Sequence, residues 1–305
     1  MSFHTPMKGR IIMKKTISLI LALMLLGSCF ALADNSNDSR AVIGADLSSG
    51  EIDTVYDMFD IDRGDVKELV VTNADEREYL EGLVSEKLIG TRSISCVYIE
   101  VLDEGEGMDV SVKNISWCTP DMYMNAMVTA GITDADVIVA APFTVSGTAA
   151  LTGVYKAYED ITGKKLDDDA KQVGTQELTT TAELADDIGS DDSTAIVNEL
   201  KLIIDEIAKM SDEELRQEII SIASKYDVEL TDNQIQQLID LCRAMQKLDI
   251  GQLKEKVKQV QQYFKNITST RENIEGFFRN IGSTVSEVID QIIGFFQNLF
   301  GMNKS

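Results

Sequence analysis

The sequence contains a single histidine, His4, in a chain of 305 residues. His4 lies in an amino-terminal segment that we expect to be removed, so the mature protein would have no imidazole side chain. This excludes Ser-His-Asp and Cys-His nucleophile pairs and the common zinc sites. From the sequence we therefore predict no catalytic residue, no metal site and no cofactor.

Basic residues are also scarce: 28 lysines and arginines stand against 51 aspartates and glutamates, which gives a formal net charge of −23. The first 33 residues hold four of the basic residues and no acidic ones. The rest of the chain then has 24 basic and 51 acidic residues, a formal charge of −27. So acidic a protein is repelled by nucleic acid and by anionic lipid, and we expect no nucleic-acid partner.

The apolar run at residues 17–26 is too short to span a bilayer, which takes about 20 residues. Two lysines precede this run, and small residues follow it before Asp34. This order is typical of a secretory signal peptide. We predict cleavage after Ala33, with lipidation of Cys29 as the alternative. The mature protein would then be secreted, extracellular or associated with the cell envelope, without a transmembrane helix.

Only three prolines occur, which argues against long extended linkers, and the 44% hydrophobic content is ordinary for a folded soluble protein. Strand and helix patterns are interspersed up to about residue 190, and only helical patterns follow. We predict a signal peptide at residues 1–33, an α+β domain at 34–190 and a helical region at 191–305. The α+β part should hold a mixed sheet of about five strands with covering helices.

Two predicted strands, residues 94–102 and 110–117, are joined by an acidic, glycine-containing turn and together predict a hairpin. Cys96 and Cys118 flank this hairpin, and disulfides persist outside the cell. A cross-strand disulfide is possible if the register brings the two Cα atoms within about 7 Å. The alternative is that both cysteines are small buried hydrophobic side chains.

Residues 136–153 combine a β-branched apolar run, typical of a buried strand, with a helix that Ser146 or Thr148 is expected to cap. The free N–H groups of such a helix start can bind an anion. The loop between strand and helix is thus a candidate ligand site, formed by Thr144, Ser146, Gly147 and Thr148. The alternative is an ordinary strand–helix corner, because the loop lacks the glycine spacing and the lysine of a phosphate cradle.

Two further patterns concern acidic residues. Asn73 and Glu76 have the spacing of a capping box at the start of a helix.

Acidic clusters at residues 167–169, 186–187 and 191–192 could hold calcium weakly, but Asp and Glu are also favoured in the first turn of solvated helices. We favour the interpretation that these clusters are helix starts and not calcium sites.

Several runs of this sequence resemble the YpuA-like family of secreted Gram-positive bacterial proteins, domain of unknown function 1002. They are residues 44–47, 90–95, 114–117, 129–132, 140–143 and 145–153. The resemblance covers about residues 41–189, with weaker agreement in the helices beyond. The family implies no established activity, cofactor or catalytic residue.

From Leu253 to Leu299 hydrophobic residues recur at alternating spacings of four and three, broken only by Arg271. This heptad repeat is typical of a coiled-coil seam. Glycines within the repeat weaken a long helix and favour an antiparallel intrachain bundle over an intermolecular coiled coil. Extra aromatic residues toward the carboxyl end favour a protein partner or self-association through these helices.

Together these patterns predict an exported protein of the cell envelope or exterior that acts by binding or as a structural component, without catalysis. The alternative is a carboxylate-dependent hydrolase acting on a cell-wall polymer, because paired acids can carry acid–base chemistry without histidine. Such an enzyme needs two carboxyl groups about 5–10 Å apart in an open cleft, at least one with a raised pKa.

Overall fold

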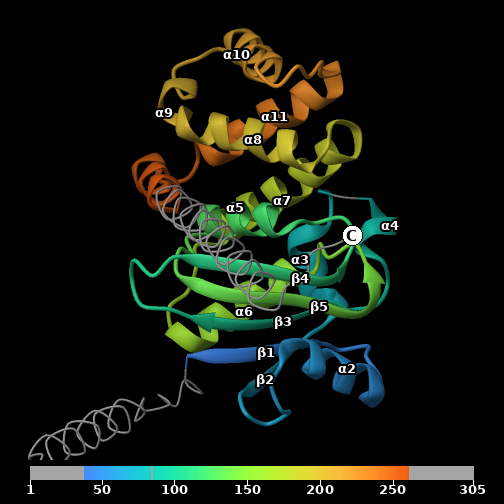
Figure 1. Cartoon of the computed structure of the whole chain (residues 1–305). Helices are drawn as coiled ribbons and strands as arrows, with labels where there is room; N and C mark the ends of the chain where they lie inside the picture. Colours follow the sequence, from blue (N-terminus) through green and yellow to red (C-terminus); the bar gives the residue numbers. More distant parts are fainter. Residues whose placement is uncertain (1–37, 84, 261–305) are drawn as a thin grey trace, which may run out of the picture.

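The computed structural model describes residues 38–83 and 85–260, and a five-stranded sheet lies at its centre (Figure 1). The strands stand in the order β2-β1-β3-β5-β4. Their bounds are β1 Ser39–Gly44, β2 Lys67–Val71, β3 Cys96–Val101, β4 Met108–Ile115 and β5 Ala135–Val145. β1, β2, β4 and β5 run in one direction, and β3 is antiparallel to its neighbours β1 and β5. The predicted mixed sheet of an α+β fold is confirmed.

The predicted hairpin of β3 and β4 is wrong, because β5 lies between these two strands. Val97 of β3 pairs with Val139 of β5, and Val112 of β4 pairs with the same residue from the other side. β5 carries the apolar run, so pairing on both sides buries its backbone in the middle of the sheet. β4 is parallel to β5 and reaches it through helix α5 (Pro120–Ala130), the crossover that a parallel pair requires.

Helices cover both faces of the sheet. α2 (Ser49–Phe59) connects β1 to β2 and packs Val55, Tyr56 and Phe59 onto one face. On the other face α6 (Ala150–Thr162) crosses β3 and β1. A Cβ atom at Gly153 of α6 would lie 3.3 Å from a methyl of Val97, so the absence of a side chain there lets the helix lie close to the sheet.

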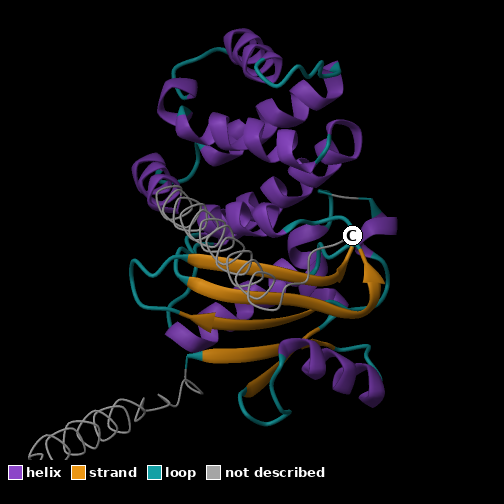
Figure 2. Cartoon of the chain, viewed as in Figure 1, coloured by secondary structure: helices purple, strands orange, loops and turns teal. Residues whose placement is uncertain are grey.

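The remaining helices form a layered bundle on the sheet (Figure 2). α7 (Asp168–Ile188) packs against α5, and α8 (Ser190–Leu202) and α11 (Asp232–Met245) pack on α7 from outside. α10 (Asp212–Ser224) lies against α8 and α11, and the short helices are α3 (Asn73–Leu80), α4 (Glu86–Ile89) and α9 (Ile204–Ile207). Among the described residues, no helix combines the length and the hydropathy needed to cross a bilayer.

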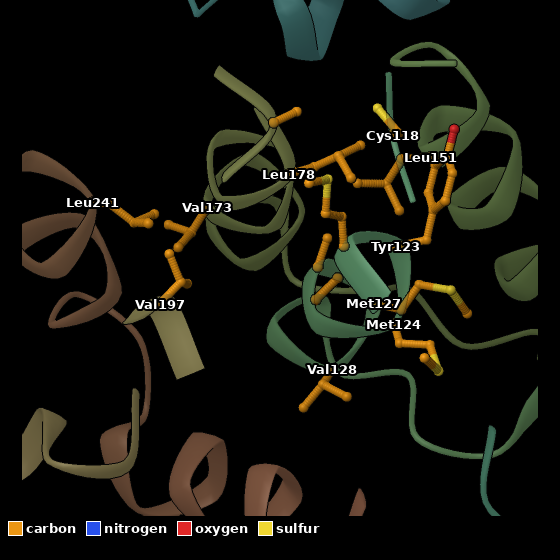
Figure 3. Close-up of a cluster of buried hydrophobic side chains, with 14 of the residues drawn as sticks. Cys118, Tyr123, Met124, Met127, Val128, Leu151, Val173, Leu178, Val197 and Leu241 are labelled. Atoms are coloured by element: carbon orange, nitrogen blue, oxygen red, sulfur yellow. The ribbon is translucent and has the colours of Figure 1, made fainter. Parts of the chain in front are cut away.

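One hydrophobic cluster joins the sheet to the bundle. It includes Val42 of β1, Leu178 of α7, Leu241 of α11 and Val260. Figure 3 shows side chains of α5, α7, α8 and α11 within it. Burial of this shared apolar surface holds sheet and bundle together.

A buried ion pair crosses the bundle between α7 and α8. Lys201 Nζ lies 2.8 Å from Glu177 Oε1, and the two side chains are 0% and 1% exposed. The ammonium group also donates to the carbonyl of Asn125, at 3.0 Å, and the hydroxyl of Thr129 donates to Glu177. Both charged groups thus have hydrogen-bond partners on α5, which a buried pair needs.

The predicted heptad seam begins inside the described part of the chain. Residues 250–260 are helical, and Leu253, Val257 and Val260 are buried in the main cluster. These first seam positions therefore pack within the chain. The remaining seam positions, up to Leu299, lie outside the described residues, as do the predicted signal peptide and its cleavage sites at Ala33 and Cys29.

Cys96 and Cys118 are both free and buried in the structure, so the possible disulfide between them is not formed. The physical reason is the strand order, since β5 separates the two strands that they were expected to bridge. Cys96 packs in the cluster beneath α2, and Cys118 belongs to the main cluster. Burial raises the pKa of each thiol to about 12, so neither is a reactive thiolate at neutral pH. Both act as small hydrophobic side chains, the predicted alternative.

Candidate functional site

The carboxyl ends of β1, β2, β4 and β5 meet at one edge of the sheet, because these four strands run in the same direction. Open sheets with parallel strands commonly bind ligands at this edge. A pocket of about 250 Å³ lies there, which we call the carboxyl-edge pocket. It is lined by Ile89, Arg92, Ile94, Ser95, Val145, Ser146, Thr148 and Ala149.

The loop of residues 90–95 forms one wall, and the turn that follows β1 fixes it in place. The N–H of Ser93 donates to Asp46 Oδ2 at 2.7 Å, and the N–H of Asp46 donates back to the Ser93 carbonyl at 3.2 Å. Arg92 donates to the carbonyl of Asp46 at 2.7 Å. Two of the runs that carry the family resemblance, 44–47 and 90–95, are therefore in direct contact.

The loop between β5 and α6 forms the other wall. Its backbone turns at Gly147, where φ is +96°, a value that L side chains rarely adopt. The hydroxyl of Tyr123 on α5 donates to the Gly147 carbonyl, and the N–H of Cys118 donates to the carbonyl of Ser146 at 3.2 Å. The N–H of Ser116 donates to Val145 at 2.9 Å. These bonds hold the loop rigidly against the start of α5.

Two buried hydroxyl groups face the pocket. Thr148 is 2% exposed and Ser95 is 8% exposed, and no hydrogen bond within the described part of the chain engages either side chain. Neither hydroxyl oxygen is among the side-chain atoms of the described residues that are closed off from water without a partner, so both are open to the pocket, where a ligand or water can bond to them. Helix α6 also begins without a side-chain cap, because its N-cap residue is Ala149. The prediction that Ser146 or Thr148 caps this helix is therefore wrong.

Of the four residues predicted to form the ligand loop, Ser146 and Thr148 line the carboxyl-edge pocket. Gly147 shapes the turn between them, and Thr144 is exposed on β5 and is not part of the lining. Sequence reasoning missed Arg92 and Ser95, which come from a loop some 50 residues upstream. Their inclusion in one of the resemblance runs is the signal that could have drawn attention to them.

Glu76 lies completely buried beneath the 90–95 loop, where it accepts hydrogen bonds from the hydroxyl of Ser93 and the amide of Asn73. The predicted Asn73–Glu76 capping box is shifted by one residue, since Thr72 and Asp75 form it instead. That shift leaves the Glu76 side chain free to turn inward. Burial, and more weakly the charges of Asp46 and Asp75, raise the pKa of Glu76 to about 7.

Loss of the proton from Glu76 should make the protein less stable as the pH rises. The unfolded carboxyl ionises near 4.5, whereas the folded one holds its proton up to about 7. Stability present below pH 4.5 is therefore lost between these values, by an amount on the order of 3 kcal/mol. In Glu76→Gln, which stays neutral, we expect this loss to disappear when urea unfolding is compared at pH 5 and pH 8.

The exposed Glu78 on the same helix provides the control, because Glu78→Gln should keep the pH dependence of the original protein. An equally steep loss of stability in Glu76→Gln would contradict the assignment of the titrating group.

Two of the three acidic clusters serve as helix starts, as the sequence predicted, whereas Asp186 and Asp187 lie in the last turn of α7, so the prediction is wrong for that cluster. Asp167 caps α7 by accepting from the N–H of Ala170, and Asp168 and Asp169 occupy its first turn. Asp191 and Asp192 stand in the first turn of α8. No group of three or more histidine, cysteine, aspartate or glutamate side chains is arranged to hold a metal ion within residues 38–83 and 85–260.

The family described as "Protein of unknown function (DUF1002)" matches residues 43–263. The uncharacterized protein YpuA of Bacillus subtilis (strain 168) is 36% identical over 285 residues, which cover 91% of this chain and 93% of that protein. No solved structure matches significantly.

Proposed function

Because the chain belongs to the DUF1002 family, described as proteins of unknown function, we propose a role from its own geometry: it is a non-enzymatic binding protein that holds a small ligand in the carboxyl-edge pocket. The observation that carries this proposal is the pair of hydroxyls of Thr148 and Ser95, which line a pocket of about 250 Å³ and have no hydrogen-bond partner among the described residues. Polar groups that line a pocket and are not engaged by the protein are available to fix the orientation of a ligand.

We place this binding protein outside the cytoplasm, in the cell envelope or the medium. The support is the sequence of residues 1–33, which has the order of a secretory signal peptide. Amino-terminal sequencing of the protein recovered from envelope and medium would find Asp34 first after ordinary cleavage, or a lipidated Cys29 in the alternative. Recovery from cytosol with the first 33 residues intact would refute export.

The geometry favours binding over the alternative of a carboxylate-dependent hydrolase. Such an enzyme needs a carboxyl group with a raised pKa in an open cleft. Burial raises the pKa of Glu76, but its side chain is completely buried, where a cell-wall polymer has no access to it. Burial also raises the pKa of Asp121, which lines a pocket, but no second carboxyl group is among the residues that line that pocket.

Binding in the carboxyl-edge pocket should depend on the Thr148 hydroxyl. Thr148→Val keeps the shape of the side chain and removes the donor, so we expect ligand-induced increases in melting temperature, measured over a panel of small polar molecules, to be lost or much reduced. Thr144→Val, a matched change on the exposed part of β5, should leave these increases unchanged. Equal responses from both variants would place any ligand elsewhere.

A further inference from the structure

The carboxyl-edge pocket differs in charge from the rest of the molecule. The chain has 51 acidic residues, yet no aspartate or glutamate is among the eight residues that line this pocket, and Arg92 is. Two other pockets of the described residues contain acids together with lysines. One beside Tyr79 is lined by Asp75, Glu78, Glu159 and Asp168 with Lys156, Lys165 and Lys171, and one beside Gly131 by Asp167, Asp169 and Asp249 with Lys165, Lys247 and Lys256. A pocket lined by a cation and no acids in so acidic a protein favours an anionic ligand.

The start of α6 adds hydrogen-bond donors to the same pocket. In its first turn the N–H of Ala150 is bonded to Gly147 at 3.0 Å and that of Thr152 to Ala149 at 3.2 Å. No side chain caps the remaining donors of the turn. The 13-residue helix also directs the positive end of its dipole toward Ala149 and Thr148, which line the pocket.

The carboxyl groups near the 90–95 loop do not oppose an anion there. Asp46 accepts from the N–H of Ser93, and Glu76 is bonded on the opposite side of that loop to the Ser93 hydroxyl and to Asn73. Neither carboxyl lines the pocket. The side-chain donors that line it are the hydroxyls of Ser95, Ser146 and Thr148 and the guanidinium of Arg92, one nitrogen of which also donates to the carbonyl of Asp46.

We propose that the carboxyl-edge pocket recognises an oxyanion, a phosphate, sulfate or carboxylate group, between Arg92, the hydroxyls of Ser95 and Thr148, and the N-terminus of α6. This proposal rests on the proposed binding function and specifies the chemical class of its ligand. Arg92 supplies the charge, and the two hydroxyls, which have no hydrogen-bond partner among the described residues, supply direction. The helix start adds further donors, and no carboxylate in the lining competes with the anion.

Isothermal titration of the full chain with inorganic phosphate, sulfate and acetate, and with glycerol as a neutral polyol, tests this proposal. We expect binding of at least one oxyanion and none of glycerol. Arg92→Gln and Thr148→Val should each weaken the binding of the oxyanion about tenfold or more, because each removes a hydrogen bond to it. The hydrogen bond that Arg92→Gln removes is a charged one. Thr144→Val should bind like the original protein.

The outcomes separate this inference from the proposed function. Glycerol binding that is lost in Thr148→Val and kept in Arg92→Gln would refute the oxyanion and leave a binding pocket in place. Oxyanion binding that neither substitution weakens would assign the ion to another surface and refute the inference. A chain that binds none of the four probes refutes the oxyanion site, and the broader ligand panel then decides whether the pocket binds anything. Circular dichroism of each variant confirms that it is folded.

Discussion

Replacing Lys201 with methionine should reduce the free energy of unfolding by about 3–5 kcal/mol, because it leaves the Glu177 carboxylate buried without its counter-charge. The pair lies in the centre of the bundle, where both side chains are almost completely inaccessible to water. Burial already raises the pKa of Glu177, and removal of the ammonium would raise it further. The protonated carboxyl costs less to bury, so the loss should be larger at pH 8 than at pH 5. Urea unfolding at both pH values measures it.

Two comparisons make this expectation specific to an uncompensated buried charge. The double variant Glu177→Leu/Lys201→Met removes both charges and should be close to the original stability, within about 2 kcal/mol. Lys225→Met breaks an ion pair with Glu199 whose partners are 55% and 30% exposed, and should cost no more than about 1 kcal/mol. If the single and double variants at 177 and 201 lose the same stability, packing and not charge accounts for the effect.

Adding one methyl group at Gly44 should also cost the fold about 3 kcal/mol or more. A Cβ atom there would lie 2.4 Å from the carbonyl oxygen of Ser93, 2.7 Å from its carbonyl carbon and 2.9 Å from the nitrogen of Ile94. All three are backbone atoms, so no side chain can rotate away. Gly44→Ala must therefore push β1 and the 90–95 loop apart.

Gly50→Ala provides the matched control, since Gly50 lies in helix α2 and a Cβ atom there would meet no other atom within 4 Å. That change should stabilise the protein by up to about 1 kcal/mol, because alanine loses less backbone freedom on folding. Thermal unfolding of both variants measures the contrast. Gly44→Ala should also lose ligand responses in the carboxyl-edge pocket, because the displaced loop carries Arg92 and Ser95. If Gly44→Ala has the stability of the original protein, the 90–95 loop can move away from β1 at no cost, and the expectation is wrong.

Local patterns predicted the elements of this fold well, because helix and strand periodicity are properties of neighbouring residues. The helix start at the acidic cluster of residues 167–169 and the apolar strand within residues 136–153 are examples. These local patterns do not determine the order of the strands in the sheet. The acidic turn between β3 and β4 resembles a hairpin turn, and only the competition of both strands for β5 determines that they do not pair.

Only part of the candidate site could be predicted, because part of it is a local feature of the chain and part depends on contacts between distant segments. The β5–α6 loop is a local feature, so Ser146 and Thr148 could be singled out from the sequence. Arg92 and Ser95 reach the pocket because Gly44 allows the 90–95 loop to lie on β1, a contact between distant segments. The inward turn of Glu76 depended on a one-residue shift of the helix cap, and sequence patterns place helix boundaries no more accurately than that.

Trp117 is the single tryptophan of the chain, and its position gives the protein a native fluorescent reporter. Its indole N–H donates to both carboxylate oxygens of Asp186 on α7, at 3.0 Å each, and its ring packs against the small cluster of Leu80 and Ile89. Ile89 also lines the carboxyl-edge pocket, as does Ala149, which packs against the same cluster. Emission from this one ring therefore reports both separation of α7 from the sheet and occupancy of the pocket, so unfolding and binding can be followed in the same cuvette without any added label.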